Sequence, residues 1–222
     1  TGAQTVTLAR NSPAAQITSV DISASSLAVA RRKAEAAGVT NVEFREADIF
    51  ALPFEEGSFD HVFVCFVLEH VARPVEALRV LQAVLRPGGT ITVIEGDHGS
   101  AYFYPDSEAA HRAIECQVRL QRAAGGNAMI GRELFPLLTR SGFSSVRVSP
   151  RMVYVDSSRP EFVDGFTKKT FTAMIEGVRA SAIAAGLIAP EAFDRGVRDL
   201  YRTAEEDGVF CYTFFKGVGV RR

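Results

Sequence analysis

Hydrophobic and polar positions switch between strand-like and helix-like periods through the first hundred residues. Short runs rich in β-branched or aromatic residues predict strands at residues 17–22, 41–48, 59–66 and 90–95. Helical spacing predicts helices over residues 3–10, 27–37 and 74–86. Because these strands and helices alternate with short turns, the pattern predicts an α/β fold with a doubly wound, mostly parallel sheet.

The second half of the chain is less regular and more helical. The same criteria predict helices at 107–124 and 131–141, a strand at 146–155, a mostly helical stretch at 160–207 and a final strand at 209–220. Internal repeats and low-complexity linkers are absent from the sequence. We therefore expect one domain, residues 1–222, in which 101–207 form a helical cap and substrate region and 208–222 the last, antiparallel strand.

Composition narrows the possible partners. The chain has 222 residues, 47% of them hydrophobic and 23% charged, with a net charge of −1. A balanced charge gives no general attraction to a phosphate backbone or an anionic membrane, so we expect a small-molecule substrate and neither nucleic acid nor membrane as partner. Three scattered cysteines without metal-ligand spacing predict reduced thiols, a cytoplasmic location and no metal site.

Two acids stand where predicted strands end. Asp21 and Asp48 follow successive strands, and in an open α/β sheet ligands bind beyond the carboxyl ends of the strands. An ionised carboxylate only accepts hydrogen bonds, so Asp21 suits the paired hydroxyls of a ribose and Asp48 an exocyclic amine. The alternative is that both acids simply cap the following turns. Their convergence at one rim favours a nucleoside ligand.

Five segments in order carry a more specific resemblance. They are Thr1-Gly2, VDIS at 20–23, ADIFALPFEEGSFD at 47–60, LEHV at 68–71 and LRPGGTITV at 85–93. Together they resemble class I S-adenosylmethionine-dependent methyltransferases, and within these the ubiquinone/menaquinone-type and related small-molecule enzymes. The resemblance implies a Rossmann-like fold, S-adenosylmethionine as the cofactor, and methyl transfer to an oxygen, nitrogen or carbon of a small molecule.

The resemblance also assigns the adenosine end of the cofactor site. It implies that Asp21 binds the ribose, with Ile22 beside it against the adenine. Asp48 would face the adenine amine, and Ile49 would lie on the other side of the ring.

At the methionine end, Thr1 and Gly2 match the last residues of the family's glycine-rich turn, and Cys65 would offer its backbone carbonyl to the cofactor's amino group. The family's first strand and the earlier glycines of that turn precede this point. We therefore expect residues 1–100 to form a cofactor-binding half that lacks its first strand, and the sequence to be a fragment of a longer chain.

Two other functional classes stay open at this stage. A nicotinamide-dependent oxidoreductase also places a ribose-binding acid after its second strand, and Tyr212 and Lys216 show the Tyr-x-x-x-Lys spacing of short-chain dehydrogenases. On a predicted strand these two side chains would lie about 13 Å apart, whereas that chemistry needs them on one helix face, so we interpret the match as chance. A non-catalytic binding module is the second alternative, because methyl transfer needs little acid–base machinery.

The acceptor is expected to meet the segment at 95–105, which we interpret as a loop after the strand at 90–95. Asp97 or His98 would remove a proton from a hydroxyl or amine, while Tyr102 and Tyr104 would contact the acceptor. Arg132 would bind an acidic group of the substrate. The alternative is that these polar side chains face water. We expect a monomer or a homodimer.

Overall fold

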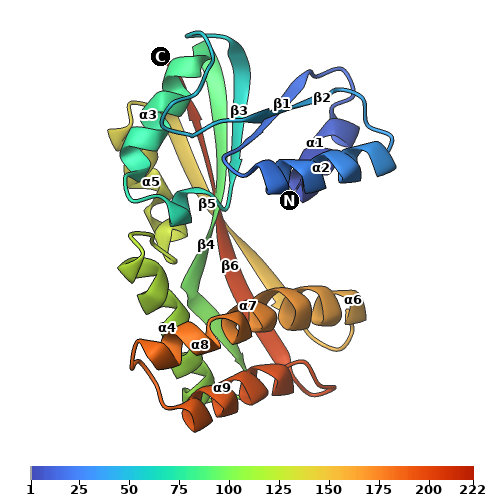
Figure 1. Ribbon diagram of the computed structural model, residues 1–222, viewed down its shortest axis with the longest axis vertical. Coiled ribbons are helices and arrows are strands. Elements are labelled where there is room, and N and C mark those ends of the chain that lie inside the picture. The colour runs from blue at the N-terminus through green and yellow to red at the C-terminus, as the bar shows by residue number, and fades with distance from the viewer. Residues whose placement is uncertain (1) are drawn as a thin grey trace.

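The computed structural model describes residues 2–222 and contains two β-sheets surrounded by helices (Figure 1). The strands are β1 (Ile17–Asp21), β2 (Val42–Glu46), β3 (Phe59–Cys65), β4 (Leu85–Tyr104), β5 (Ser144–Val155) and β6 (Val209–Val220). The helices of the first half are α1 (Ala3–Asn11), α2 (Ala24–Ala36), η1 (Leu68–His70) and α3 (Pro74–Val84). Those of the second half are α4 (Glu108–Ala123), η2 (Ile130–Glu133), α5 (Leu134–Arg140), α6 (Pro160–Phe162), the π-helical η3 (Val163–Thr172), α7 (Ala173–Gly177), α8 (Arg179–Ala184) and α9 (Pro190–Arg202).

The larger sheet has the strand order β3-β4-β6-β5. β3 and β4 are parallel because α3 makes the crossover between them, and its helical apolar positions are buried. β6 pairs antiparallel with both β4 and β5, which confirms the prediction for the last strand. Thr90, on β4, lies opposite Val220, on β6, at one end of that pairing, and Tyr104 lies opposite Val209 at the other end.

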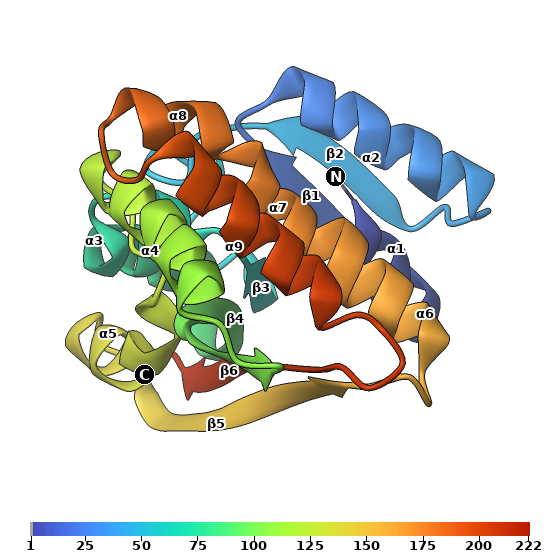
Figure 2. The same ribbon diagram turned by 90° about the horizontal axis from the view of Figure 1, so that it is seen from below.

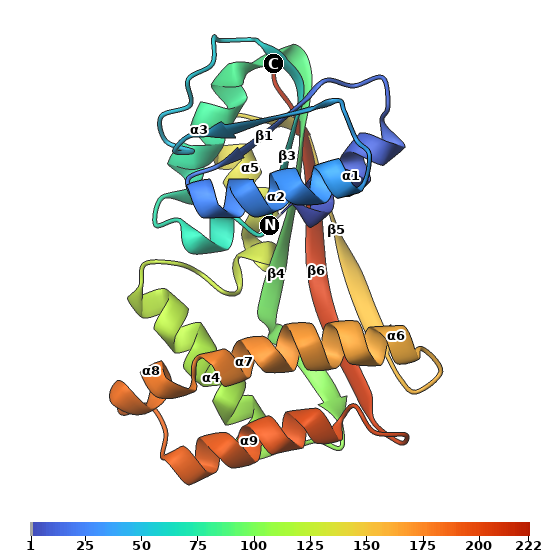
Figure 3. The same cartoon turned by 45° about the vertical axis from the view of Figure 1, so that its right-hand side comes forward.

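The smaller sheet consists of β1 and β2, which are parallel and paired from Ile17↔Val42 to Asp21↔Glu46. Helices α1 and α2 pack with this pair (Figure 3). Ser23 caps α2, since its hydroxyl accepts the Ser26 N–H at 3.2 Å. Among residues 2–222, no strand pairs with β1 on its side away from β2, or with β3 on its side away from β4.

Two hydrophobic cores stabilise the molecule, and β4, β5 and β6 extend through both. In the upper core of Figure 1, Ile91 and Val93 of β4 pack among residues of α3 and α5. In the lower core, Phe103 of β4 and Phe210 of β6 pack among residues of α4, η3 and α7–α9. The view from below shows these cap helices on one side of the strands (Figure 2).

One predicted element is wrong. Residues 95–105 do not form a loop, because β4 continues to Tyr104. The register shifts between Asp97 and Tyr102, so a bulge interrupts the pairing with β6 before it resumes at Tyr102↔Cys211. Glycines and polar residues made this stretch loop-like in the sequence, but β6 provides a long-range partner for its backbone. The candidate acceptor residues therefore stand on a strand.

Candidate active site

The strand ends bring Asp21 and Asp48 to one rim of the smaller sheet. Asp21 is the last residue of β1 and lies opposite Glu46, the last residue of β2. The Ala47 N–H donates to the Asp21 carbonyl at 3.1 Å, so the chain leaves β2 alongside the end of β1. Asp48 follows directly. Because parallel strands end at the same edge, the two carboxylates share the side at which ligands bind in this class of sheet.

Each carboxylate makes one local hydrogen bond. Asp21 Oδ1 accepts the Ser23 N–H at 2.9 Å, and Asp48 Oδ1 accepts the Phe50 N–H at 2.9 Å. These are turn contacts two residues along the chain, as the capping alternative requires. The helix cap itself is Ser23, however, and the second oxygen of each carboxylate has no hydrogen-bond donor among residues 2–222. The geometry leaves both acids able to accept from a ligand.

The other adenosine-end residues differ in exposure. Ile22 is 68% exposed directly beside Asp21, so it offers apolar surface to a ligand bound there. Ile49 is half-buried and packs against the upper core.

Gly2 occupies a position that only glycine fits. It precedes α1 with φ 79°, and its carbonyl accepts the Val6 N–H at 3.1 Å. A Cβ atom there would lie 2.6 Å from Ala30 Cβ of α2. This is the conformation of a tight turn that leads into α1. Thr1 lies outside the described residues.

The turn after β3 is held by a carboxylate that is not among the predicted site residues. Cys65 is the last, half-buried residue of β3, and Phe66 follows with φ 55°. Glu95 is fully buried on β4, and its Oε1 accepts the N–H groups of Val67 at 3.0 Å and Leu68 at 2.8 Å. Burial raises the pKa of Glu95 to about 7. Burial, with Glu95 and Glu69 nearby, raises the pKa of the Cys65 thiol to about 12, so the thiol stays protonated.

Asp97 and Arg132 form an ion pair with each other. The guanidinium donates two hydrogen bonds to the Asp97 carboxylate, each at 2.7 Å, and Asp97 is 2% exposed. Asp97 Oδ1 also accepts the Gly99 N–H at 3.0 Å. A carboxylate held in this way orients the bulge of β4, and the same contact raises the pKa of Arg132. The roles predicted for the two side chains remain predictions.

His98 lies buried between the sheet and the cap, with a defined tautomer. Its Nδ1 is 3.0 Å from the Ala128 carbonyl oxygen, which can only accept, so Nδ1 carries the proton of the neutral ring. The hydroxyl of Tyr212 lies 3.1 Å from the same nitrogen. Nε2 is 3.5 Å from Met174 Sδ, an atom without a proton to give. Burial lowers the pKa of His98, so the free Nε2 lone pair is available near neutral pH.

Aromatic side chains connect His98 with the turn after β3. Phe66 and Phe214 have ring centroids 5.4 Å apart, and Phe166 of η3 lies 5.9 Å from Phe214. Tyr212 lies 4.8 Å from Phe214 and 5.7 Å from the His98 ring. The region between the turn after β3 and His98 is therefore aromatic on both the sheet and the cap side.

Tyr102 and Tyr104 stand apart from this region. They are 53% and 60% exposed, and the Tyr102 hydroxyl donates to Met152 Sδ at 2.9 Å across the sheet. Their neighbour Phe103 faces the lower core, and alternation along a strand turns the two tyrosines to the opposite face. Their predicted contact with an acceptor stays a prediction.

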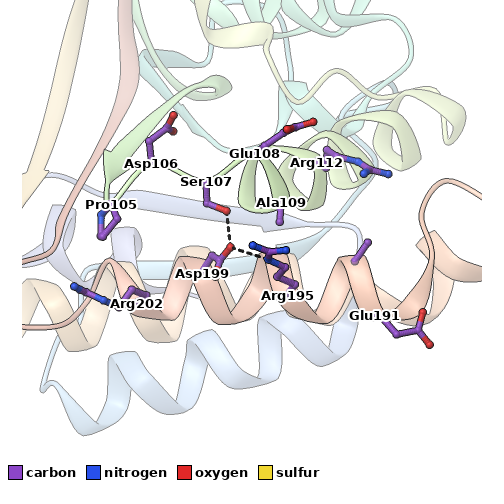
Figure 4. Close-up of a pocket in the computed structure, with 11 residues that line it drawn as sticks. Pro105, Asp106, Ser107, Glu108, Ala109, Arg112, Glu191, Arg195, Asp199 and Arg202 are labelled. Atoms are coloured by element: carbon purple, nitrogen blue, oxygen red, sulfur yellow. Dashed lines mark hydrogen bonds and ion pairs between the residues drawn. The ribbon is translucent and has the colours of Figure 1, made fainter.

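Two cavities flank α4. The larger, of about 650 Å³, lies between the start of α4 and α9 and has mostly charged walls, including Arg112, Arg195 and Asp199 (Figure 4). It contains none of the predicted site residues. The smaller, of about 340 Å³, is lined by His98, Gly99 and Met129 together with one face of α4.

The structure also bears on the Tyr-x-x-x-Lys spacing and on the three cysteines. Tyr212 and Lys216 are both on β6, so their spacing is not the helical one of short-chain dehydrogenases. Cys65, Cys116 and Cys211 are all free thiols. Within residues 2–222, no group of histidine, cysteine or acidic side chains is arranged to hold a metal ion, and no helix is long and apolar enough to cross a membrane.

Comparison with known proteins finds a likeness to methyltransferases in the first part of the chain. Residues 1–93 match the model of a family described as "Methyltransferase domain". Demethylmenaquinone methyltransferase from Thermus thermophilus is 43% identical over 95 residues, which are 43% of this chain and 43% of that protein. An uncharacterized 37.1 kDa protein of transposon Tn4556 from Streptomyces fradiae is 35% identical over 168 residues, 75% of this chain and 47% of that protein. The chain thus spans about half the length of these curated relatives.

A solved structure extends the likeness to nearly the whole chain. Phosphoethanolamine N-methyltransferase 2 from Haemonchus contortus, in complex with S-adenosylhomocysteine, superposes with a TM-score of 0.56 at 19% identity. The match covers 96% of this chain and 46% of that one. At this identity it shows the fold. The resemblance to class I methyltransferases predicted from the sequence, and the Rossmann-like fold class, are confirmed.

Proposed function

We propose that this chain, which matches the methyltransferase domain family over residues 1–93, transfers a methyl group from S-adenosylmethionine to a small-molecule acceptor. The observation that carries the proposal is the convergence of Asp21 and Asp48 at the ends of two paired parallel strands. Those are the acids that the family resemblance assigns to the ribose and the adenine amine.

The residues present fit the adenosine part of this cofactor. Asp21 and Asp48 each keep one carboxylate oxygen free of protein donors among residues 2–222, and Ile22 offers exposed apolar surface next to Asp21. The tight turn at Gly2 supports close approach of the backbone to the cofactor. When bound, S-adenosylmethionine supplies an electrophilic methyl group on a sulfonium.

We assign proton removal from the acceptor to His98. Ala128 fixes the Nδ1 tautomer, so Nε2 is the basic nitrogen, and the lowered pKa of the ring keeps it unprotonated at neutral pH. A base of this kind suits a hydroxyl, an amine or an acidic C–H group. Asp97 is less suited to the role, because Arg132 and the Gly99 N–H already occupy its carboxylate.

The aromatic surroundings favour an apolar acceptor with a flat ring. Phe66 and Phe166 each contact the ring of Phe214, in the region between the turn after β3 and His98. Such surfaces exclude water from the acceptor and align it for in-line displacement, which supplies most of the rate enhancement in this chemistry. The name of the Thermus thermophilus relative, demethylmenaquinone methyltransferase, gives demethylmenaquinone as that protein's substrate. A cytoplasmic location is part of the proposal, supported by the three free cysteines.

The proposal is tested by incubating the full-length protein with methyl-deuterated S-adenosylmethionine and a panel of phenols, quinols, amines and carboxylates. Mass spectrometry then follows S-adenosylhomocysteine and any product three mass units heavier per methyl group than its unlabelled counterpart. We expect both to form together, with a ring-bearing acceptor. Formation of neither, in a protein that also fails to bind S-adenosylhomocysteine, contradicts the proposal.

A further inference from the structure

In the turn after β3, three consecutive backbone N–H groups have no hydrogen-bond acceptor on the neighbouring strand. The ladder with β4 ends where the Phe66 N–H donates to the Ile94 carbonyl at 3.0 Å. Phe66 then adopts φ 55°, a left-handed conformation that is uncommon for a bulky side chain. The chain turns away from β4, and the next three N–H groups, those of Val67, Leu68 and Glu69, lose the strand as an acceptor.

Glu95 supplies the missing acceptor from inside the sheet. Its Oε1 accepts from Val67 at 3.0 Å and from Leu68 at 2.8 Å, and its Oε2 lies 3.4 Å from the Glu69 nitrogen. The side chain is fully buried. A buried carboxylate is costly unless several donors satisfy it, and here the donors are consecutive peptide groups of a single turn.

The carboxylate is itself held in place. Gly131 of η2 packs directly on the backbone of Glu95 and Gly96, since a Cβ atom at Gly131 would lie 2.8 Å and 2.7 Å from their carbonyl oxygens. On the other side β6 pairs with β4 at Glu95↔Phe215. Glu95 therefore cannot move without disturbing the sheet and η2.

We propose that Glu95 is a positioning residue, whose carboxylate fixes the turn that presents the Cys65 carbonyl and Phe66 to the cofactor. The inference rests on the proposed function, because it concerns the same binding site. A carboxylate that accepts hydrogen bonds from backbone N–H groups can stabilise the fold or can position the turn for the cofactor. Removing its charge distinguishes the two roles, because a role in stability predicts a lower thermal midpoint and a role in positioning predicts a lower affinity for the cofactor.

Four titratable groups interact electrostatically with Glu95. Glu69 and His70 lie on the turn itself, Cys65 at the end of β3 and Tyr212 on β6. Since burial raises the pKa of Glu95 above its ordinary value, ionisation within the fold is unfavourable and costs stability as the pH rises through about 7. Charge-assisted hydrogen bonds are nonetheless stronger than neutral ones, so the ionised form holds the turn more firmly.

Two substitutions separate the roles. Glu95→Gln keeps an oxygen for Val67 and Leu68 but removes the charge, whereas Glu95→Ala leaves all three N–H groups without a partner. We expect the dissociation constant of S-adenosylhomocysteine, measured by calorimetry on the full-length protein near pH 8, to rise about threefold or more in E95Q and at least about tenfold in E95A. The thermal midpoint of E95Q near pH 8 should equal or exceed that of the unsubstituted protein, because a buried charge is gone. Thr92→Val, a buried change on the same strand, is the matched control and should bind normally.

The pH dependence gives the second readout. Binding to the unsubstituted protein should weaken as the pH falls from about 8 to about 6, and E95Q should lack this change. The hydrogen bond to Glu69 raises the pKa of His70, which makes His70 the competing source of a pH dependence, so a pH step that persists in E95Q overturns the proposal. Equal affinity in E95Q also overturns it, as does a loss of affinity matched by a lower thermal midpoint. If the unsubstituted protein binds no S-adenosylhomocysteine, the proposed function fails, and this inference with it.

Discussion

Replacing His98 by asparagine tests the assignment of the general base. The asparagine amide nitrogen lies close to the position of Nδ1, so it can still donate to the Ala128 carbonyl. It has no counterpart of Nε2, the nitrogen that faces Met174 in the present structure. The substitution thus removes the base and keeps the hydrogen bond that holds the side chain.

The expected loss of kcat in H98N follows from the role of His98 as general base. A positioned general base contributes roughly 100-fold to 10,000-fold to a proton-transfer step, which corresponds to about 3–5 kcal/mol of transition-state stabilisation. We expect kcat to fall by a factor in this range for a hydroxyl or amine acceptor. The affinity for S-adenosylhomocysteine should change less than about twofold, because His98 is assigned to the acceptor and not to the cofactor.

The pH profile adds an independent check. Burial lowers the pKa of His98 from its usual value near 6.5, so the rate should rise with pH through a value below 6.5 and stay level above it. The stability that neutral His98 provides is present above its unfolded-state pKa and is lost as the pH falls through the window between that value and the lowered one. H98N should show neither effect.

Steady-state assays of labelled methyl transfer measure kcat, and calorimetry measures the affinity for S-adenosylhomocysteine. His111→Asn is the matched control, since His111 is exposed, pairs with Asp106 at 2.8 Å and stacks on Phe103. Its kcat should stay within about twofold. An unchanged kcat in H98N refutes the reasoning, and so does a loss of kcat that only mirrors a loss of cofactor affinity.

Two further predictions concern the cofactor rim and the sheet. Asp21→Ala should weaken S-adenosylhomocysteine binding at least about tenfold in calorimetry, because hydrogen bonds to a carboxylate contribute about 1.5–3 kcal/mol. Asp60→Ala removes an exposed acid away from the rim and should leave the affinity unchanged. Equal affinities in the two variants would contradict the ribose assignment. Gly96→Ala should lower the free energy of unfolding by about 1–3 kcal/mol in urea titrations, because its Cβ would lie 2.4 Å from the buried Tyr212 hydroxyl, and an unchanged midpoint would show that Tyr212 moves freely.

Local sequence patterns were enough to identify most of the fold. The strands at β1, β3 and β6 and the helices at α1, α3 and α4 agree with prediction to within a few residues, because their periodicity and capping residues are strong local signals. The local pattern does not predict the extension of β4 beyond Glu95, because this extension depends on pairing with β6 on both sides of the bulge between Asp97 and Tyr102.

The candidate site divides in the same way. The sequence places Asp21 and Asp48 at strand ends correctly, because the ends of strands are readable from local patterns. The contact between His98 and Tyr212 joins residues 114 positions apart, and no local pattern reports it. For Glu95 the sequence contains one usable signal, because this acid stands within the apolar run of a predicted strand. An acid buried in a strand needs hydrogen-bond donors around it.

Calorimetric titration of the full-length protein with S-adenosylhomocysteine, alongside NADH, tests the central claim most directly. The account predicts saturable binding of one S-adenosylhomocysteine per chain, weakened by Asp21→Ala, and no binding of NADH. Saturable binding of NADH with no binding of S-adenosylhomocysteine would contradict it.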